Sequence, residues 1–392
     1  MDSKMIKLDK TNKTTILFLS WRDIKAPKRG GAEVYTHEML KRIDNSKYRI
    51  IHISPEFENS KKEEFIENIR YLRMGKNSIS VIFEAEKFYR SNKENIDYVV
   101  DQCNTHRFFT KLWVPAHKRI FFIHQLTREI WHLNAKAPLS IIGYYTETLF
   151  LKLSKNDYTI TVSESTKKDL LAVGFNPEKV FILPEGIDFE HWDRESFFPK
   201  EQMPTFIYVG RFVNYKGIDD TVKAFSNVKL KYPEARLWIV GKKNQQYIDD
   251  VLKSILDEKK LSYGDEKDNP DVVFFGFVSD EKKLELMSRA HALIFPSQRE
   301  GWGLIITEAA AVGTPSIGYN SSGIVDAIDF GKAGYLCINN NVESIIKHME
   351  NIITDKKGYE ELREKAYEFS LKFHWNNTAT AFNSFMEKIK KY

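Results

Sequence analysis

Short apolar runs alternate with stretches of helical periodicity along the first half of the chain. The runs have the length of buried strands, and between them apolar residues recur at the three- and four-residue spacing of one helix face. We predict strands at 15–20, 48–54, 96–100, 119–124, 157–162 and 180–183. We predict helices at 33–43 and 163–171, and Ser163 is a good cap for the second. Such alternation is typical of a parallel, doubly wound sheet.

The pattern starts again after the segment 184–204, which has no clear period and is rich in Pro, Phe and charged residues. In the second half we predict strands at 205–209, 236–240, 272–275, 292–295 and 315–319. We predict helices at 217–228, 281–290 and 304–312. Gly or Pro follows four of these strands, which suits loops that approach a ligand closely. Doubly wound sheets bind ligands at the carboxyl ends of their strands, so we expect two facing domains with a cleft between them.

Length and composition fit this division. The chain has 392 residues, of which 42% are hydrophobic and 29% charged, so it is too long for one ordinary domain and can bury two cores. We place a first α/β domain at 1–190 and a second at 191–374. An amphipathic helix at 375–392 is expected to pack back on the first domain.

The charge balance argues against a nucleic-acid binder. Lys and Arg number 59 and Asp and Glu 54, a net charge of +5 that is not gathered in basic runs. Residues 1–190 hold 31 basic and 25 acidic side chains, so residues 191–392 hold 59 − 31 = 28 and 54 − 25 = 29. The excess in the first half indicates either an anionic partner for that domain or a chance distribution of solvated charges.

Cysteine content and hydropathy set the expected compartment. Two cysteines, Cys103 and Cys337, exclude a disulfide scaffold and a Cys-rich metal site and fit a reducing compartment. The N-terminal residues are polar and lack the apolar run of a signal peptide. No apolar stretch approaches the ~20 residues that cross a bilayer. We therefore expect a cytoplasmic protein, which can still lie peripherally on the inner face of a membrane.

Three segments carry candidate chemistry. In the first, Gly30 and Gly31 follow the first strand and open a helix, so that free N–H groups face an anion, although a tight turn alone also explains two glycines. In the second, Arg211 and Lys216 follow the strand that ends before Gly210. Arg forks onto phosphate oxygens and Lys adds a point charge, so we favour an anion site here over two solvated cations.

The third segment is Glu300-Gly-Trp-Gly-Leu-Ile-Ile-Thr-Glu308. Gly301 and Gly303 leave bare N–H groups near the start of a helix, which is a nest for phosphate. A carboxylate beside an anion site is costly unless it binds hydroxyls or offsets a developing cation, and sugars supply both. Glu at a helix start is also ordinary dipole chemistry.

Taken in order along two doubly wound domains, these three segments resemble the retaining glycosyltransferases of family 4, which have the GT-B fold of two Rossmann-like domains. The resemblance covers nearly the whole chain, and Glu300 and Glu308 match the family's pair of carboxylates with seven residues between them. Glu185 departs from the family, which more often has Asn before the following Gly. Supporting segments are SWRD at 20–23, SES at 163–165, LPEGID at 183–188 and GTP at 313–315.

The resemblance implies a role for each matching position. Arg211 and Lys216 would hold the donor diphosphate, Glu300 the sugar hydroxyls and Glu308 the ribose hydroxyls. His124, at the end of the strand 119–124, would sit near the donor sugar, although most of the 10 histidines are surface or core residues by default. The further donor-binding positions so implied are Gly30, Gly31, Glu33, Gly210, Val278, Gly301, Trp302, Gly303 and Leu304.

The implied activity is transfer of a sugar from a UDP- or GDP-linked donor, UDP being favoured, to an acceptor hydroxyl with retention of configuration. No cofactor or metal is expected, because no cluster of ligands and no Asp-x-Asp sequence occurs. The expected acceptor is a glycan, a lipid-linked sugar or a glycoconjugate of the cell surface. A nucleotide-sugar 2-epimerase of the same fold and a non-catalytic nucleotide-sugar-binding subunit are the alternatives.

The acceptor is expected to meet the loops 21–29 and 61–89 of the first domain. Phe83, Lys87, Phe88, Tyr89 and Arg90 combine cations with aromatic side chains, which suits docking to an anionic membrane surface. The same residues also fit an ordinary amphipathic helix packed on its sheet, which we favour.

Overall fold

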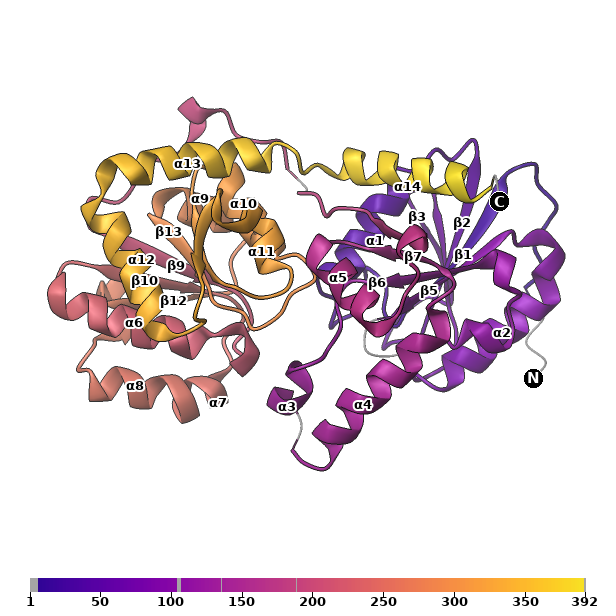
Figure 1. Cartoon of the computed structure of the whole chain (residues 1–392), viewed down its shortest axis with the longest axis horizontal. Coiled ribbons are helices and arrows are strands. Elements are labelled where there is room, and N and C mark those ends of the chain that lie inside the picture. Colours follow the sequence, from indigo (N-terminus) through magenta and orange to yellow (C-terminus); the bar gives the residue numbers. More distant parts are fainter. Residues whose placement is uncertain (1–5, 104–106, 135, 188, 391–392) are drawn as a thin grey trace. The chain divides into compact units, whose positions relative to one another are not determined.

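The computed structural model describes residues 6–103, 107–134, 136–187 and 189–390, and it divides into two compact units. Unit 1 comprises Met1–Thr127, Ile142–Asp188 and His374–Tyr392, and unit 2 comprises Arg128–Ile141 and Phe189–Phe373. The segment Arg128–Ile141 thus groups with unit 2, although it lies within residues 1–190 of the sequence. Figure 1 shows both units, coloured along the chain.

Within the described residues, unit 1 contains an eight-stranded sheet in the order β3-β4-β2-β1-β5-β6-β7-β8. All neighbouring strands are parallel except β3 and β4, which form an antiparallel hairpin at one edge. The strands are β1 (Thr14–Leu19), β2 (Tyr48–Ser54), β3 (Glu63–Ile66), β4 (Ile69–Arg73), β5 (Tyr98–Cys103), β6 (Arg119–Ile123), β7 (Tyr158–Thr161) and β8 (Val180–Ile182).

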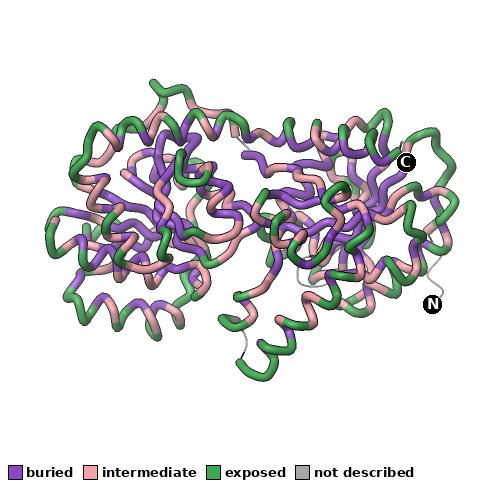
Figure 2. Tube along the Cα trace, in the orientation of Figure 1, coloured by how far each residue is buried: buried purple, intermediate pink, exposed green. Residues whose placement is uncertain are grey.

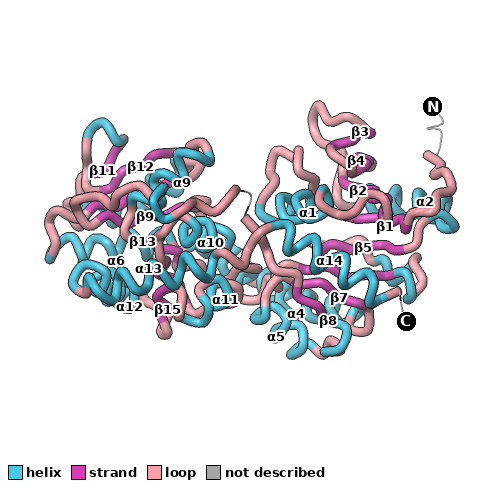
Figure 3. The backbone as a smooth tube through the Cα atoms, turned by 90° about the horizontal axis from the view of Figure 1, so that it is seen from above, coloured by secondary structure: helices cyan, strands magenta, loops and turns pink. Residues whose placement is uncertain are grey.

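Helices cover both faces of this sheet (Figure 3). They are α1 (Gly31–Lys41), α2 (Ser80–Asn92), α4 (Leu139–Leu151), α5 (Glu164–Val173) and the C-terminal α14 (Trp375–Ile389). Helix α14 packs beside α1: the ring of Trp375 meets Tyr35 edge-on at 5.5 Å, and Phe382 lies 6.1 Å from Phe18 of β1. The apolar stripe of the C-terminal segment is therefore buried in unit 1.

Unit 2 contains a seven-stranded, wholly parallel sheet in the order β11-β12-β10-β9-β13-β14-β15, counted over the described residues. Its strands are β9 (Thr205–Val209), β10 (Arg236–Val240), β11 (Tyr263–Gly264), β12 (Val272–Gly276), β13 (Ala292–Phe295), β14 (Ser316–Tyr319) and β15 (Gly334–Cys337). The strands are near-continuously apolar because both faces are covered, and Figure 2 shows them buried.

Most helices of unit 2 lie on the two faces of its sheet, while α3 contacts the turn η7, and residues of α6, α8 and α12 share one core cluster with the strands. They are α3 (Ile130–Asn134), α6 (Ile218–Lys231), α7 (Gln245–Tyr247), α8 (Lys253–Glu258), α9 (Asp280–Arg289), α10 (Leu304–Ala311), α11 (Ile324–Ala327), α12 (Val342–Thr354) and α13 (Lys356–Ser370). A 3-10 turn, η7 (Asn214–Lys216), precedes α6.

The prediction of two doubly wound parallel sheets is confirmed. Sequence patterning misses the hairpin β3–β4, because β3 is a charged and exposed edge strand with no apolar run. The segment 80–92 is the helix α2, and Phe88 and Tyr89 are buried in the core of unit 1, which confirms the packed amphipathic helix. Across the described ranges, no helix combines the length and hydropathy needed to span a membrane.

Candidate functional site

The loop after β9 in unit 2 is fixed by a close approach to the end of β13. Gly217 has a left-handed φ of +69° at the start of α6, and a Cβ atom there would lie 2.3 Å from the carbonyl oxygen of Pro296. The N–H of Gln298 also donates to the carbonyl of Tyr215 at 2.8 Å. Only glycine allows this contact, and the contact presents Lys216 to the segment that follows β13.

Lys216 and Glu300 form an ion pair at this junction. The Lys216 Nζ contacts Glu300 Oε1, and each side chain is only 13% exposed. The same carboxylate oxygen accepts a 2.6 Å hydrogen bond from Ser297 Oγ. The ammonium also lies 5.3 Å from the ring centre of Phe295, which adds a cation–π contribution. Both charges are therefore held in fixed positions before any ligand arrives.

This pair straddles the switch point of the sheet in unit 2. Strand β9 is central, with β10 on one side and β13 on the other, and the chain winds outward in both directions from it. Lys216 follows β9 and Glu300 follows β13, so both leave the carboxyl edge of the sheet. Doubly wound sheets bind ligands at this crevice.

Arg211 lies on the same loop and is exposed. Its Nη2 donates to the hydroxyl of Tyr215 at 2.6 Å, which orients the guanidinium without neutralising it. Gly210, before it, is half-buried at the end of β9. Val278 is half-buried in the loop between β12 and α9, next to Phe277, whose side chain is exposed.

Helix α10 begins directly after the Gly-rich segment. Gly303 has a φ of +108° and caps the helix, of which Leu304 is the first residue. Trp302 is buried against Phe373, and its Nε1 donates to Thr307 Oγ1 at 2.9 Å, so this indole holds the start of the helix. Gly301 is buried beside it.

Glu308 is placed in the second turn of α10, as predicted, and meets Lys283 of α9. The Glu308 Oε2 lies 2.9 Å from Lys283 Nζ. Burial raises the pKa of Glu308, and the nearby ammonium opposes that effect. Glu300 and Glu308 thus each face a different lysine.

In unit 1, Gly30 and Gly31 begin α1 after the loop that follows β1. The carboxylate of Glu33 accepts a 2.6 Å hydrogen bond from the Gly30 N–H and a 3.1 Å hydrogen bond from Arg22 Nε. The N–H of Gly30 is therefore used by the protein itself. Glu33 is buried and stabilises the start of the helix as a capping carboxylate.

His124 leaves the carboxyl end of β6 and is almost fully buried. Its Nε2 lies 3.1 Å from the amide nitrogen of Gln102, which also donates to Thr36 Oγ1. The amide of Gln102 therefore orients the imidazole ring of His124. Nδ1 lies 3.7 Å from Glu185 Oε1, so the residue that departs from the family pattern faces the predicted histidine.

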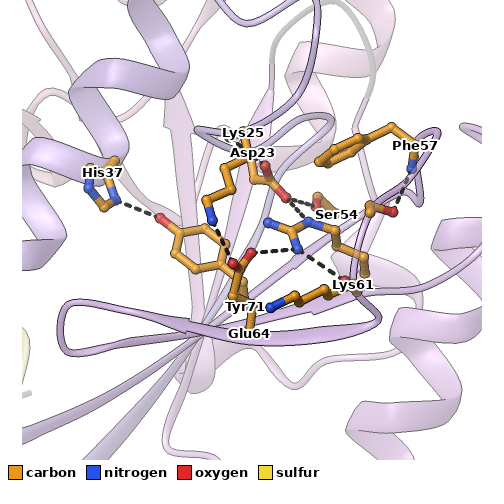
Figure 4. Close-up of polar contacts among 10 residues, drawn as sticks. Asp23, Lys25, His37, Ser54, Phe57, Lys61, Glu64 and Tyr71 are labelled. Carbon is orange, nitrogen blue, oxygen red and sulfur yellow. Dashed lines mark hydrogen bonds and ion pairs between the residues drawn. The ribbon is translucent and has the colours of Figure 1, made fainter.

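A buried ionic network holds the loop between β1 and α1 (Figure 4). Asp23 Oδ2 lies 2.6 Å from Arg73 Nε at the end of β4, and both side chains are at most 1% exposed. Ser54 Oγ donates to the same oxygen at 3.0 Å, and Arg73 Nη1 reaches Glu64 at 3.0 Å. The network ties the loop to the ends of three strands.

Several residues of these clusters escape sequence reasoning. Their residue types are common on any surface, and for Lys283, Gln102 and Arg73 the partners are also far away along the chain, so no spacing marks them. They are Ser297, Tyr215, Lys283, Gln102, Arg22 and Arg73. Over the described ranges, no group of three or more His, Cys, Asp or Glu side chains is arranged to hold a metal ion.

Two family models match the chain and together span residues 29–369. Residues 29–191 match Glycosyltransferase Family 4, and residues 189–369 match Glycosyl transferases group 1. The two doubly wound domains are those of the GT-B fold, and the chain belongs to the glycosyltransferases that this pair of models defines. The resemblance to family 4 and its GT-B fold is thereby confirmed.

Three individual proteins illustrate what the chain is similar to. Glycogen synthase of Mycobacterium tuberculosis is 27% identical over 233 residues, which are 58% of this chain and 53% of that protein. The chain thus spans about half the length of this curated relative. Sucrose-phosphate synthase from Thermosynechococcus elongatus superposes with a TM-score of 0.74 at 17% identity, covering 97% of this chain and 100% of that one. Anabaena HepE, solved with UDP and glucose, has a TM-score of 0.68 at 14% identity over 95% and 99%.

Proposed function

We propose that the protein transfers a sugar from a nucleotide-diphosphate sugar to an acceptor hydroxyl, with retention of the anomeric configuration. The observation that carries this proposal is the Lys216–Glu300 pair at the switch point of unit 2. A fixed ammonium suits the diphosphate, and a fixed carboxylate suits the hydroxyls of the sugar. Arg211, on the same loop, supplies a second cation that can move onto the phosphates.

In the proposed reaction, the bond between the sugar C1 and the β-phosphate oxygen breaks while negative charge grows on the leaving diphosphate. Lys216, Arg211 and the N–H groups at the start of α10 stabilise that charge. The acceptor oxygen bonds to C1 on the same face, and its proton passes to a departing phosphate oxygen. Electrostatic stabilisation by groups already in place supplies the rate enhancement.

Other predicted residues receive narrower roles in this proposal. Glu308 binds the ribose hydroxyls of the donor, and Val278 borders the base. Gly210, Gly301, Gly303 and Leu304 let the backbone approach the phosphates, while Trp302 holds that backbone. In unit 1, Gly31 offers backbone N–H groups to phosphate, and His124 is oriented by Gln102 and Glu185 to meet the donor sugar.

We further propose UDP as the nucleotide. This choice is supported by HepE, a structural neighbour solved with UDP and glucose. The acceptor class that we favour is a hydroxyl of a cell-surface glycan or of a lipid-linked sugar, bound by unit 1. A hexose or an N-acetylhexosamine is the sugar proposed for transfer.

A donor screen tests this function. Purified protein is incubated with UDP- and GDP-linked sugars, with and without mixtures of lipid-linked and free glycan acceptors, and nucleotide release is measured. We expect UDP release that rises when an acceptor is present, and a product whose anomeric proton coupling matches that of the donor. Conversion of the donor sugar to its 2-epimer without acceptor would indicate the epimerase. Binding of UDP without any turnover would indicate the non-catalytic subunit.

A further inference from the structure

The outward face of α4 is apolar along its whole length, which is the reverse of a normal surface helix. The part of the helix that belongs to unit 1, residues 142–151, carries four large exposed side chains, of which Tyr145, Leu149 and Ile142 are 70%, 63% and 53% exposed. These three recur at the spacing of one helix face, and no charged residue interrupts them. Exposed apolar surfaces of this kind mark a site that something covers. The four residues are Ile142, Tyr145, Leu149 and Phe150.

The opposite face of α4 is already held by unit 1. Leu151 is buried in a core cluster with β6 and α5. Glu147, the only charged residue of the helix, accepts a hydrogen bond from the Thr127 N–H. Arg107 donates to the carbonyl of Phe150 and to Ser154 Oγ, which satisfies the last turn. The C-terminal turns of the helix are therefore fixed to unit 1, and its exposed residues appear in green in Figure 2.

The charges around this face are basic. Residues 142–155, which belong to unit 1, contain two Lys against one Glu. The acid, Glu147, is held by Thr127. Lys152 and Lys155 follow the helix, and both are exposed. Cations at the end of an apolar face complement the interface of an anionic bilayer, where apolar side chains enter the acyl boundary and lysines meet lipid phosphates.

We propose that this face of α4 docks on an anionic phospholipid membrane, with its helix axis in the plane of the interface. A helix of 13 residues is too short to span the bilayer and long enough to lie along it. The docking surface is distinct from α2, where Phe83 is exposed among the charged residues Glu84, Lys87 and Arg90. The proposal goes beyond the proposed function and does not require sugar transfer to occur.

Vesicle flotation of the full chain tests this proposal. The protein is mixed with vesicles of phosphatidylcholine alone or of phosphatidylcholine and phosphatidylglycerol at 3:1, and the floated fraction is measured. We expect flotation on the anionic vesicles that falls about tenfold or more in the double variant Ile142→Asp/Leu149→Asp, since two apolar contacts are lost and two charges added. The matched control is Phe83→Asp on α2, which should float like the unchanged protein.

The variants are exposed substitutions, so circular dichroism and thermal melting should match the unchanged protein. Lys152→Glu/Lys155→Glu should weaken flotation on anionic vesicles and leave the residual binding to phosphatidylcholine as it was. Equal flotation of all variants, or loss only in Phe83→Asp, would overturn the proposal. So would a protein that never floats but forms a dimer by light scattering that Leu149→Asp dissociates, because a second copy would then cover the face. UDP release in the donor screen is measured separately, so failure of either proposal is recognised by itself.

Discussion

Lys216 and Glu300 form an ion pair that joins the loop after β9 to the loop after β13, on the two sides of the switch point of one sheet. They are 84 residues apart in the chain. Ser297 and the ring of Phe295 complete the surroundings of the pair. Because both charges are mostly shielded from water, a ligand that replaces one partner meets a group already in position.

The hydroxyl of Ser297 is expected to position Glu300. Ser297→Ala removes the 2.6 Å hydrogen bond to Oε1 without removing the carboxylate. A hydrogen bond to a charged group contributes about 1.5–3 kcal/mol, and without it Glu300 is no longer held in one position, so we expect kcat to fall roughly tenfold or more. Steady-state kinetics with the donor from the screen measure this effect. Ser297→Thr, which keeps the hydroxyl, should retain most of the activity, and equal losses in both variants would contradict a positioning role.

Gly217 is expected to tolerate no side chain. Gly217→Ala combines a φ of +69° with a Cβ atom 2.3 Å from the Pro296 carbonyl oxygen, so the Lys216 loop must move. We expect a loss of more than about 2 kcal/mol in the free energy of unfolding of unit 2 and a large loss of activity. Gly331→Ala, at φ +90° in the same unit, has its nearest contact at an ordinary 3.7 Å. That control should cost about 1 kcal/mol and keep activity, and similar results for the two variants would refute the argument.

The buried pair Asp23–Arg73 is expected to be costly to break from one side. Arg73→Met leaves a carboxylate buried without its counter-ion, and we expect unit 1 to lose about 3–5 kcal/mol in urea unfolding. Adding Asp23→Asn should recover more than half of that loss, because the uncompensated charge is gone. Arg70→Met breaks the more exposed pair with Glu63 in the same hairpin and should cost less than about 1 kcal/mol. Additive losses in the double variant would count against this account.

Unit 1 is expected to lose stability in acid through His52. Burial lowers the pKa of this histidine to about 4, with Asp23 opposing that shift and Arg73 adding to it. In the unfolded chain the pKa is about 6.5, so between these values protons bind the unfolded state preferentially. The free energy of unfolding should fall by roughly 2 kcal/mol more between pH 7 and pH 5 in the unchanged protein than in His52→Phe.

Chemical unfolding at the two pH values measures this difference. The exposed His117 supplies the control, since His117→Phe should leave the pH dependence as it is. Identical pH dependence in His52→Phe and in the unchanged protein would show that another group carries the acid sensitivity.

Much of the fold follows from short-range patterns. The strands β2, β9, β10 and β13 begin and end at the residues predicted, because each is a short apolar run bounded by polar or Gly and Pro positions. The hairpin β3–β4 is missed because its edge strand reads Glu-Glu-Phe-Ile and is stabilised by its neighbour and not by burial. The segment 139–151 shows no helical alternation of apolar and polar residues, because the outward face of this helix is as apolar as its buried face.

The candidate site could be predicted only as separate pieces. Lys216 and Glu300 are each found from their place after a strand, but their pairing depends on the order β9–β13 in the sheet. Glu33 is predicted as a ligand of the donor, and the structure uses its carboxylate to hold Gly30 and Arg22. Residue type and spacing alone do not tell a capping carboxylate from a ligand-binding one, and the long-range pairing of Lys216 with Glu300 carries no signal in the local sequence.

The proposed donor centre in unit 2 depends most directly on the charge of Lys216. Its removal tests whether the charged pair at the switch point of unit 2 is the donor centre, and Lys223→Ala on α6 is the matched control because Lys223 pairs with Asp219 on the surface. Turnover of the donor selected by the screen is measured for both variants, with folding checked by thermal melting. We expect Lys216→Ala to lose at least about 100-fold in kcat while Lys223→Ala stays near the unchanged rate. Near-normal turnover in a folded Lys216→Ala protein would contradict the account.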